Sequence, residues 1–290
     1  MYTLTQTDIN KIRNIVLDAS DIIFEIQAKA KTEKSNQNNL KIESKGFGDY
    51  VTEIDLAVQH EIENQILSLF PEFQFFGEEG EREKYDTHKP CFILDPIDGT
   101  TNLIRQVKHS CISLAYYNGE KLDYGAIYNP FLDEFFEAQL GKGAYLIENA
   151  KLQIKSDKSI EKERLMGSNI HDLQHAIIIF GTCPHDRGKV DHRKILEVMT
   201  DAFMAGEDIS LTGSAALDLA YIASGRADVF FELKLRPWDF SAGILLCQEA
   251  GIKATNMYGE EISIFETGSV FCANPDLHQQ FYPLLEKLRS

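Results

Sequence analysis

The octapeptide Asp95-Pro-Ile-Asp-Gly-Thr-Thr-Asn102 constrains this chain more than any other stretch, because it directly follows the apolar run 91–94. The apolar run predicts a buried strand, and Pro96 keeps Asp95 extended where that strand ends. The chain then turns, which brings a second carboxylate, Asp98, back beside the first. The fold must therefore place two carboxylates together at the end of a buried strand.

The chemistry of this octapeptide is typical of a site for a divalent metal and a phosphate. Mg2+ prefers oxygen ligands, commonly one or two carboxylates with waters and phosphate oxygens, and Asp95 and Asp98 can supply the carboxylates. Gly99 lets backbone N–H groups approach an anion closely. The alternative is an Asp-Pro turn in which Asp98 only caps a helix. The complete octapeptide behind a buried strand favours the metal site.

The composition excludes several classes of protein. The chain has 290 residues and 43% hydrophobic content, which is enough for one large domain or two closely packed lobes. Its net charge of −16 disfavours direct contact with nucleic acids or anionic membranes. The five cysteines form no CxxC pair and are interpreted as reduced core residues. Because there is also no signal-peptide pattern and no long apolar stretch, we expect a soluble, cytoplasmic protein.

Hydrophobic periodicity predicts an N-terminal α+β lobe over residues 1–160. Apolar residues recur at helical spacing in 7–28 and 51–70, and the polar segment 29–40 is expected to be a surface loop. A mainly antiparallel sheet follows. Its expected strands are 74–76, 91–94, 111–117, 124–128, 134–139 and 143–147.

Strands alternate with helices after residue 160, which predicts a C-terminal α/β lobe over residues 161–290. No flexible linker separates the lobes, so we expect one compact unit with the site between them and most metal ligands in the first lobe. The expected strands are 176–180, 227–231 and 269–271, and the expected helices are 194–204, 215–223, 239–250 and a terminal helix from residue 276.

Two further clusters in the first lobe could complete the site of the octapeptide. Glu78 follows an apolar segment and Gly77, so its carboxylate can point into a cleft, although a solvated loop is the alternative. Asp55 lies three residues after Thr52. This spacing is that of a helix capping box, and a cap without a catalytic role is the alternative for both residues.

Two clusters in the second lobe lie at helix starts. Asp239 is expected to cap its helix, and the single tryptophan, Trp238, lies beside it at a strand-to-helix turn that could receive an anion or a metal. Gly213 and Ser214 open another helix and could expose N–H donors to a substrate. Close helix packing explains these small residues equally well.

In this order, the motifs resemble the inositol monophosphatase family of Mg2+-dependent, lithium-sensitive phosphatases. The similarity covers about residues 45–275, and the stretch 230–239 is most like that of bacterial inositol-1-monophosphatases. It implies the layered αβαβα sandwich of that family and a homodimer. The motifs are Asp49-x-Val-Thr-x-x-Asp55, Gly77-Glu-Glu79, the octapeptide and Trp238-Asp-x-x-Ala-Gly243.

The resemblance implies two or three Mg2+ ions. Glu78, Asp95 and the backbone carbonyl of Ile97 would hold the first ion. Asp95, Asp98 and Asp239 would hold the second, and Glu78 would also reach a third, weaker one.

The resemblance also implies catalytic and substrate-binding roles. Thr100, hydrogen-bonded to Asp55, would orient a water on the first metal, which makes Asp55, Thr100 and Glu78 the expected catalytic residues. A small phosphorylated polyol would be the substrate. The residues expected to line it are Asp98, Gly99, Thr100, Gly213, Ser214, Ala215, Glu232 and Asp239.

Departures from the family pattern leave the substrate open. Leu103 stands where the family commonly has an aromatic residue, and a basic stretch, 104–109, follows it. The polar segment 32–39 lies near a loop that carries an accessory metal in the family, a position that Asp49 and Lys45 could serve. No histidine falls in the motifs, and all eight are expected at the surface or in loops.

Three hypotheses about function follow. The first is a Mg2+-dependent phosphomonoesterase that hydrolyses myo-inositol monophosphate by attack of a metal-activated water. The second is a related sugar-bisphosphate, 3′-phosphoadenosine or histidinol phosphatase. The third is a regulatory binding protein that retains the fold and contacts RNA or the transcription machinery.

Overall fold

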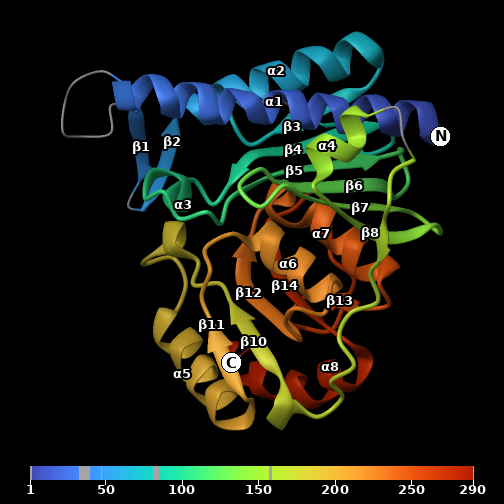
Figure 1. Cartoon of the computed structure of the whole chain (residues 1–290). Coiled ribbons are helices and arrows are strands. Elements are labelled where there is room, and N and C mark those ends of the chain that lie inside the picture. The colour runs from blue at the N-terminus through green and yellow to red at the C-terminus, as the bar shows by residue number, and fades with distance from the viewer. Residues whose placement is uncertain (1, 33–39, 47, 81–84, 157–158, 290) are drawn as a thin grey trace.

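Alternating helical and sheet layers build the fold, as Figure 1 shows. The computed structural model describes residues 2–32, 40–46, 48–80, 85–156 and 159–289. One pair of helices covers the outer face of a large sheet, a second pair lies between this sheet and a smaller one, and a third pair covers the far side of the small sheet. In that order, the pairs are α1 (Gln6–Thr32) and α2 (Glu53–Leu69), α6 (Ala215–Ala223) and α7 (Pro237–Glu249), and α5 (His192–Ala205) and α8 (Pro275–Phe281). The predicted αβαβα sandwich is confirmed.

The large sheet is antiparallel except at one edge. Its strand order is β3-β4-β5-β6-β7-β8-β9, and only the β3–β4 pair runs parallel. This agrees with the mainly antiparallel sheet expected from the sequence. The strands are β3 (Gln74–Gly77), β4 (Cys91–Asp98), β5 (Cys111–Tyr117), β6 (Leu122–Asn129), β7 (Glu134–Gln139), β8 (Gly143–Glu148) and β9 (Glu163–Arg164).

The small sheet is mixed, with strand order β11-β10-β12-β14-β13. Strand β10 runs parallel to both of its neighbours, whereas β14 runs antiparallel to both of its own. The parallel strands end at the edge that faces the first half of the chain (Figure 1). The strands are β10 (Ile177–Phe180), β11 (Asp208–Ser210), β12 (Val229–Leu235), β13 (Lys253–Thr255) and β14 (Gly268–Ala273).

The sequence analysis did not predict several short elements. An antiparallel hairpin of β1 (Ile42–Gly46) and β2 (Asp49–Thr52) precedes α2. Every residue of β1 is exposed, so its sequence shows none of the apolar alternation that reveals a strand. The short helices are α3 (Thr100–Ile104), α4 (Ala150–Lys155), α9 (Glu286–Arg289) and the 3-10 turns η1 (Leu173–His175), η2 (Pro184–Asp186) and η3 (Tyr282–Leu285).

The central helices bind the two sheets together. Leu219 of α6 and Leu245 of α7 are fully buried in one apolar cluster with Phe136 of the large sheet and Phe230 of the small one. Each such side chain contributes about 1.5–3 kcal/mol when it leaves water. Helices α6 and α7 thus come from the C-terminal half of the chain but also form the inner support of the large sheet.

Two expectations about local structure are wrong. Helix α1 continues to Thr32, so the expectation of a loop from residue 29 is wrong at its start, and residues 33–39 of that segment lie outside the described residues. His278 is buried, bonded to Thr255 and stacked on Phe271, so the expectation that every histidine is at the surface or in a loop is wrong. Within the described residues, no helix combines the length and apolar character that crossing a membrane requires.

Candidate active site

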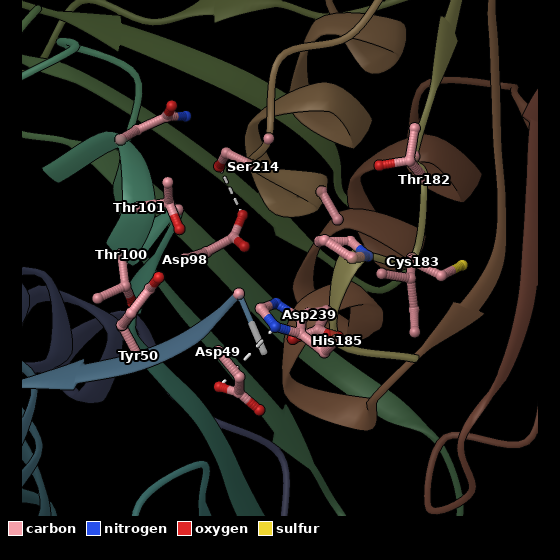
Figure 2. A pocket seen from close by; sticks show the side chains of 18 of the residues that line it. Asp49, Tyr50, Asp98, Thr100, Thr101, Thr182, Cys183, His185, Ser214 and Asp239 are labelled. Carbon is pink, nitrogen blue, oxygen red and sulfur yellow. Dashed lines mark hydrogen bonds and ion pairs between the residues drawn. The ribbon is translucent and has the colours of Figure 1, made fainter. Parts of the chain in front are cut away.

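A cleft of about 1050 Å³ opens where β4, α6, α7 and the hairpin meet, and Figure 2 shows part of its lining. It collects the predicted metal and substrate residues from five separate stretches of chain. Asp55 is the one predicted site residue that does not line it, and Asp55 reaches it through Thr100. The predicted residues in the lining are Glu78, Asp95, Ile97, Asp98, Gly99, Thr100, Gly213, Ser214, Ala215, Glu232 and Asp239.

An irregularity in strand β4 delivers its carboxylates to the cleft. Asp95 pairs with Ser113 and Asp98 with Cys111, so two residues of β4 lie opposite one of β5. Pro96, which cannot donate a backbone hydrogen bond, lies within this bulge. The Asp95 carboxylate accepts a hydrogen bond from the Ile97 backbone N–H at 2.9 Å. The bulge thereby brings the Asp95 side chain and the Ile97 backbone to the cleft.

The turn after β4 requires glycine. Gly99 has a φ of 88°, a left-handed value that residues with a Cβ rarely adopt. A Cβ there would lie 3.0 Å from the backbone oxygen of His109 and 3.2 Å from that of Gly213. The side-chain N–H₂ of Asn102 donates to the backbone oxygens of His109 and Thr212, each at 2.8 Å. The octapeptide is therefore fixed to the loop that precedes α6.

Asp98 is held by the start of α6. Its Oδ2 accepts a bond from the Ser214 hydroxyl at 2.5 Å and one from the Ala216 backbone N–H at 2.8 Å. Figure 2 shows Ser214 and Asp98 pointing toward one another across the cleft. Ser214 lines the cleft, as expected of a substrate residue, and its hydroxyl also orients Asp98.

Asp239 lies in the first turn of α7, as expected for a capping residue. Its Oδ2 accepts a bond from the backbone N–H of Arg236 at 2.7 Å, which leaves Oδ1 directed elsewhere. Trp238 does not form the mouth of a ligand site. It is buried and packs edge-on against Phe76 with ring centroids 5.2 Å apart. Trp238 therefore anchors the start of the helix that carries Asp239.

Asp55 makes both of the contacts expected of it, the helix cap and the hydrogen bond with Thr100. Its Oδ2 accepts a bond from the Thr52 backbone N–H at 2.9 Å, which completes the capping box of α2. Its Oδ1 accepts a bond from the Thr100 hydroxyl at 2.9 Å. Asp55 is fully buried, so it contacts the cleft only through Thr100.

Glu78 leaves the end of β3 and meets a lysine from the hairpin. Lys45 Nζ lies 3.3 Å from Glu78 Oε1 and 2.5 Å from Glu79 Oε1. Lys45 was considered for an accessory metal position, and here it pairs with both carboxylates. Asp49, the other residue considered, lies 3.9 Å from Nδ1 of His185.

The acidic side chains of the cleft have raised pKa values, so their ionised forms are destabilised. Burial, reinforced by the neighbouring carboxylates, raises the pKa values of Asp95 and Asp239 well above their usual range. Burial raises the pKa of Glu78 to about 7 although Lys45 opposes the shift. Burial likewise raises the pKa of Asp98 to about 6. This excess of negative charge is what a divalent cation would stabilise.

The donor set fits a hard cation. The possible ligands offer only oxygen atoms, the ligand type that Mg2+ prefers over thiolate or imidazole. They are the Ile97 carbonyl and the side chains of Glu78, Asp95, Asp98 and Asp239. Among the described residues, no three side chains of the His, Cys, Asp or Glu type form a compact ligand group by themselves. Waters and substrate oxygens commonly complete a Mg2+ shell.

Glu232 of β12 lines the cleft beside the end of β10. Its Oε1 accepts a bond from the Cys183 backbone N–H at 3.1 Å, and burial raises its pKa to about 8. Gly181 faces it so closely that a Cβ at that position would lie 1.9 Å from Oε2 of Glu232. The absence of a side chain at residue 181 therefore gives Glu232 its place.

Several lining residues escaped the sequence analysis. His185, expected at the surface or in a loop, lines the cleft from η2, and Arg187, Lys234 and Arg236 also line it. The available signal was a polar turn directly after the buried strand β10, because α/β sheets bind ligands beyond the carboxyl ends of their strands. Leu103, which precedes the basic stretch, is buried in the core, whereas Ile104 and Arg105 at the start of that stretch line the cleft.

Comparison with known proteins agrees with this geometry. The model of the inositol monophosphatase family matches residues 11–290. An inositol-1-monophosphatase of Rhizobium meliloti (strain 1021) is 33% identical over 249 residues, which cover 86% of this chain and 87% of the relative. The Nus factor SuhB of Escherichia coli (strain K12) is 36% identical over 232 residues, or 80% of each chain. The crystal structure of the extragenic suppressor protein suhB from Bartonella henselae superposes with a TM-score of 0.82 and 30% identity, covering 97% of this chain and 99% of that one.

Proposed function

Because this chain belongs to the inositol monophosphatase family, we propose that it is a Mg2+-dependent phosphomonoesterase that hydrolyses myo-inositol monophosphate to inositol and phosphate. The observation that carries this proposal is the group of carboxylates Glu78, Asp95, Asp98 and Asp239 around one cleft, each with a raised pKa. Glu78, Asp95 and the Ile97 carbonyl would hold one ion, and Asp95, Asp98 and Asp239 a second. When bound, such ions neutralise phosphoryl charge and make water a stronger nucleophile.

The protein's own contribution to the attack is proton transfer. The Thr100 hydroxyl donates to Asp55, so its oxygen lone pairs remain open to accept a hydrogen bond from a water in the cleft. As the water attacks phosphorus, its proton passes to Thr100 while the Thr100 proton passes to Asp55, the P–O bond to the alcohol breaks, and the departing alkoxide takes a proton from a second water in the cleft. Burial raises the pKa of Asp55, which makes this carboxylate a stronger base than an exposed aspartate. The left-handed turn at Gly99 leaves the backbone open to the phosphate.

The alcohol part of the substrate would lie against Glu232. This side chain is fixed on one oxygen by the Cys183 N–H, and the rest of the carboxyl group borders the cleft. A carboxyl group with a pKa of about 8 can both donate to and accept from the hydroxyls of a polyol. Ala215 and Gly213 add small residues to the same lining.

The proposal includes a cytoplasmic homodimer that is inhibited by lithium. A patch of exposed apolar side chains on α5 and after β11 supports association, because monomers rarely expose such groups together. The patch consists of Leu196, Phe203, Met204 and Leu211, which are 57%, 52%, 78% and 57% exposed. Light scattering of the purified protein at increasing concentration tests the dimer. The five cysteines are buried and free, which suits a reducing compartment.

A second candidate function is a regulatory binding role. The observation that favours it is the 36% identity to a relative named Nus factor SuhB. The two functions separate in cells that carry Asp95→Asn in place of the natural residue. If the cellular role needs phosphatase activity, this variant behaves as a deletion, and if the role is regulatory binding, the variant behaves as the natural protein.

Assay of the purified protein against a panel of small phosphoesters tests the proposed substrate. Release of inorganic phosphate from inositol 1-phosphate in the presence of Mg2+ is expected to exceed release from the other esters. Release from another ester alone would refute the substrate and leave the metal chemistry in place.

A further inference from the structure

A second cavity lies under the first turns of α1, where this helix covers strands β6, β7 and β8 of the large sheet. Its volume is about 330 Å³, which is within the range of pockets that hold small ligands. In the described part of the chain it shares no lining residue with the cleft of the metal carboxylates. Figure 1 shows the start of α1 and hairpin β1–β2, which borders that cleft, at opposite ends of the view. We call this cavity the α1 pocket, and its polar lining includes Arg13, Tyr124, Glu137, Lys142, Tyr145 and Lys162.

A buried ion pair forms the base of the α1 pocket. Arg13 donates to Glu137 through Nε at 2.7 Å and through Nη2 at 2.6 Å, and the two side chains are only 3% and 5% exposed. The Tyr124 hydroxyl donates to the same carboxylate at 3.0 Å, and Lys162 Nζ donates to it at 2.6 Å. Glu137 therefore accepts four hydrogen bonds and serves two cations at once.

The α1 pocket has an excess of positive charge. Arg13, Lys142 and Lys162 line it, and among the described residues Glu137 is the one acidic side chain that does so. Although burial opposes the shift, Arg13 and Lys162 hold the pKa of Glu137 below its usual range, so this carboxyl group is ionised near neutral pH. Three positive charges against one negative charge leave the pocket at +2, in a chain whose net charge is −16.

Lys142 has no carboxylate partner that would reduce this excess. Its Nζ donates to the neutral amide oxygen of Gln139 at 2.9 Å, and in the described part of the chain no carboxylate oxygen lies within 4.0 Å of it. Asp123 is close enough to feel the charge of Lys142, but its Oδ2 accepts a bond from the Leu4 backbone N–H. An ammonium group has three donors, so both Lys142 and Lys162 retain donors for a ligand.

Arg164 adds a further positive charge at the edge of the α1 pocket. Its guanidinium lies 5.2 Å from the centre of the Tyr145 ring, and Lys162 Nζ lies 5.7 Å from the same ring. A Cβ at Gly143, which lines the pocket, would overlap this guanidinium. The acceptors of Arg164 are neutral oxygens, namely the Tyr145 hydroxyl and the backbone carbonyls of Lys142 and Glu249. The surroundings of the pocket therefore do not cancel its charge.

We propose that the α1 pocket binds a small dianion, a phosphate or a dicarboxylate, through the ammonium groups of Lys142 and Lys162. Charge-assisted hydrogen bonds to anionic oxygens are the chemistry that the two ligand classes share, and two negative charges match the excess of the pocket. The lining comes from α1, the β7–β8 turn and the segment before β9. A bound dianion joins these three segments and stabilises the packing of α1 on the sheet.

Calorimetric titration of the Mg2+-loaded protein tests the pocket with three probes. Succinate and inorganic phosphate are the two dianions, and acetate is the monoanion of similar chemistry. We expect at least one dianion to bind in the α1 pocket with a Kd of about 1 mM or lower. Acetate should bind at least about tenfold more weakly. Because phosphate can also occupy the metal cleft, its arm counts sites, and each dianion that the pocket accepts contributes one site there.

Variants test whether the two lysines cause the binding. Lys142→Gln/Lys162→Gln should raise the Kd for the dianion in the pocket at least about tenfold and abolish the rise in Tm that the dianion gives. Lys151→Gln/Lys155→Gln is the matched control, because it removes the same charge from lysines that pair with Asp21 and Asp18 outside the pocket. This control should keep the natural affinity. If the first double variant does not fold, Lys142→Gln alone replaces it, since this change breaks one bond to a neutral side chain.

Hydrogen exchange locates the bound anion. Backbone amides of residues 139–143 should exchange more slowly in the presence of the dianion, whereas those of hairpin β1–β2 should not change with succinate. Slowing confined to the hairpin would place the anion in the metal cleft and overturn the inference. It is also overturned if the natural protein binds neither dianion more tightly than acetate, if the pocket variant keeps the natural affinity, or if the control loses as much affinity as the pocket variant. Each of these measurements is independent of phosphatase activity.

Discussion

The Thr100 hydroxyl donates to Oδ1 of Asp55 at 2.9 Å and so joins the turn after β4 to the first turn of α2. The same carboxylate caps α2 through Thr52. A residue that holds a helix end in place is therefore also the group that would accept the proton of the attacking water. In the proposed mechanism this side chain serves both stability and catalysis, and variants of Asp55 and of Thr52 should separate the two roles.

Asp55→Asn is expected to lower kcat by about a hundredfold or more, because an amide cannot accept the proton. Thr52→Ala removes the capping hydroxyl, which also donates to Oδ2 of Asp55, and should lower the free energy of unfolding by about 1 kcal/mol. Because Oδ1 of Asp55 keeps its bond to Thr100, the effect on kcat should be much smaller. Urea unfolding and steady-state kinetics of both variants measure this difference. Equal losses of kcat in the two variants would show that Asp55 acts only through the structure.

Asp95→Asn is expected to reduce activity by about three orders of magnitude or more without unfolding the protein. Because Asp95 is buried among like charges, a neutral amide relieves repulsion and should maintain or raise Tm in the absence of metal. The rise in Tm that Mg2+ gives the natural protein should disappear in this variant. Asp201→Asn is the control, since Asp201 is a surface partner of Lys287 outside the cleft. A normal Mg2+ response in Asp95→Asn would remove Asp95 from the metal site.

The metal-free protein should become less stable as the pH rises through neutrality. The pKa of Glu78 is raised to about 7 and that of Asp98 to about 6, so the folded state binds more protons than the unfolded state in this range. The resulting stabilisation is fully present below the unfolded pKa values and is lost as the pH rises through the folded ones. Chemical unfolding in chelator from about pH 5 to about pH 8 measures the slope. Saturating Mg2+ should flatten or reverse it, and an identical slope with and without Mg2+ would contradict a metal centre at these carboxylates.

Gly181→Ala is expected to raise KM for inositol 1-phosphate by about tenfold, or ~1.4 kcal/mol, with a smaller effect on kcat. The added methyl group would displace Glu232, which borders the alcohol end of the cleft. Gly268→Ala is the matched control, because a Cβ at that position meets no atom within 4 Å among the described residues. Similar kinetics for the two variants would separate Glu232 from substrate binding.

The residues of the octapeptide could be predicted because their roles follow from local chain geometry. The buried strand, the proline that interrupts its pairing and the glycine that allows a positive φ are consecutive in the sequence, so the pattern can be recognised there. Glu78 and Asp239 were also identifiable, since each lies where a strand ends or a helix begins. These patterns depend on the conformational preferences of neighbouring residues, so they can be recognised in a single sequence.

The contacts that orient those residues could not be predicted. Ser214 holds Asp98 across 116 residues of chain, and Asn102 reaches Thr212 across 110. Such contacts depend on how α6 and α7 pack between the sheets. The presence of Arg187 and Arg236 in the lining of the cleft could not be predicted for the same reason, because they lie on separate segments that meet only in the folded chain. Hairpin β1–β2 escaped because its first strand buries no side chain.

The most direct test of the account is phosphate release from inositol 1-phosphate measured against Mg2+ concentration, with the natural protein beside Asp95→Asn. We expect activity that rises with Mg2+, disappears in excess chelator, returns when Mg2+ is restored and is absent from Asp95→Asn at every concentration. Activity that persists undiminished in excess chelator would contradict the proposed metal mechanism.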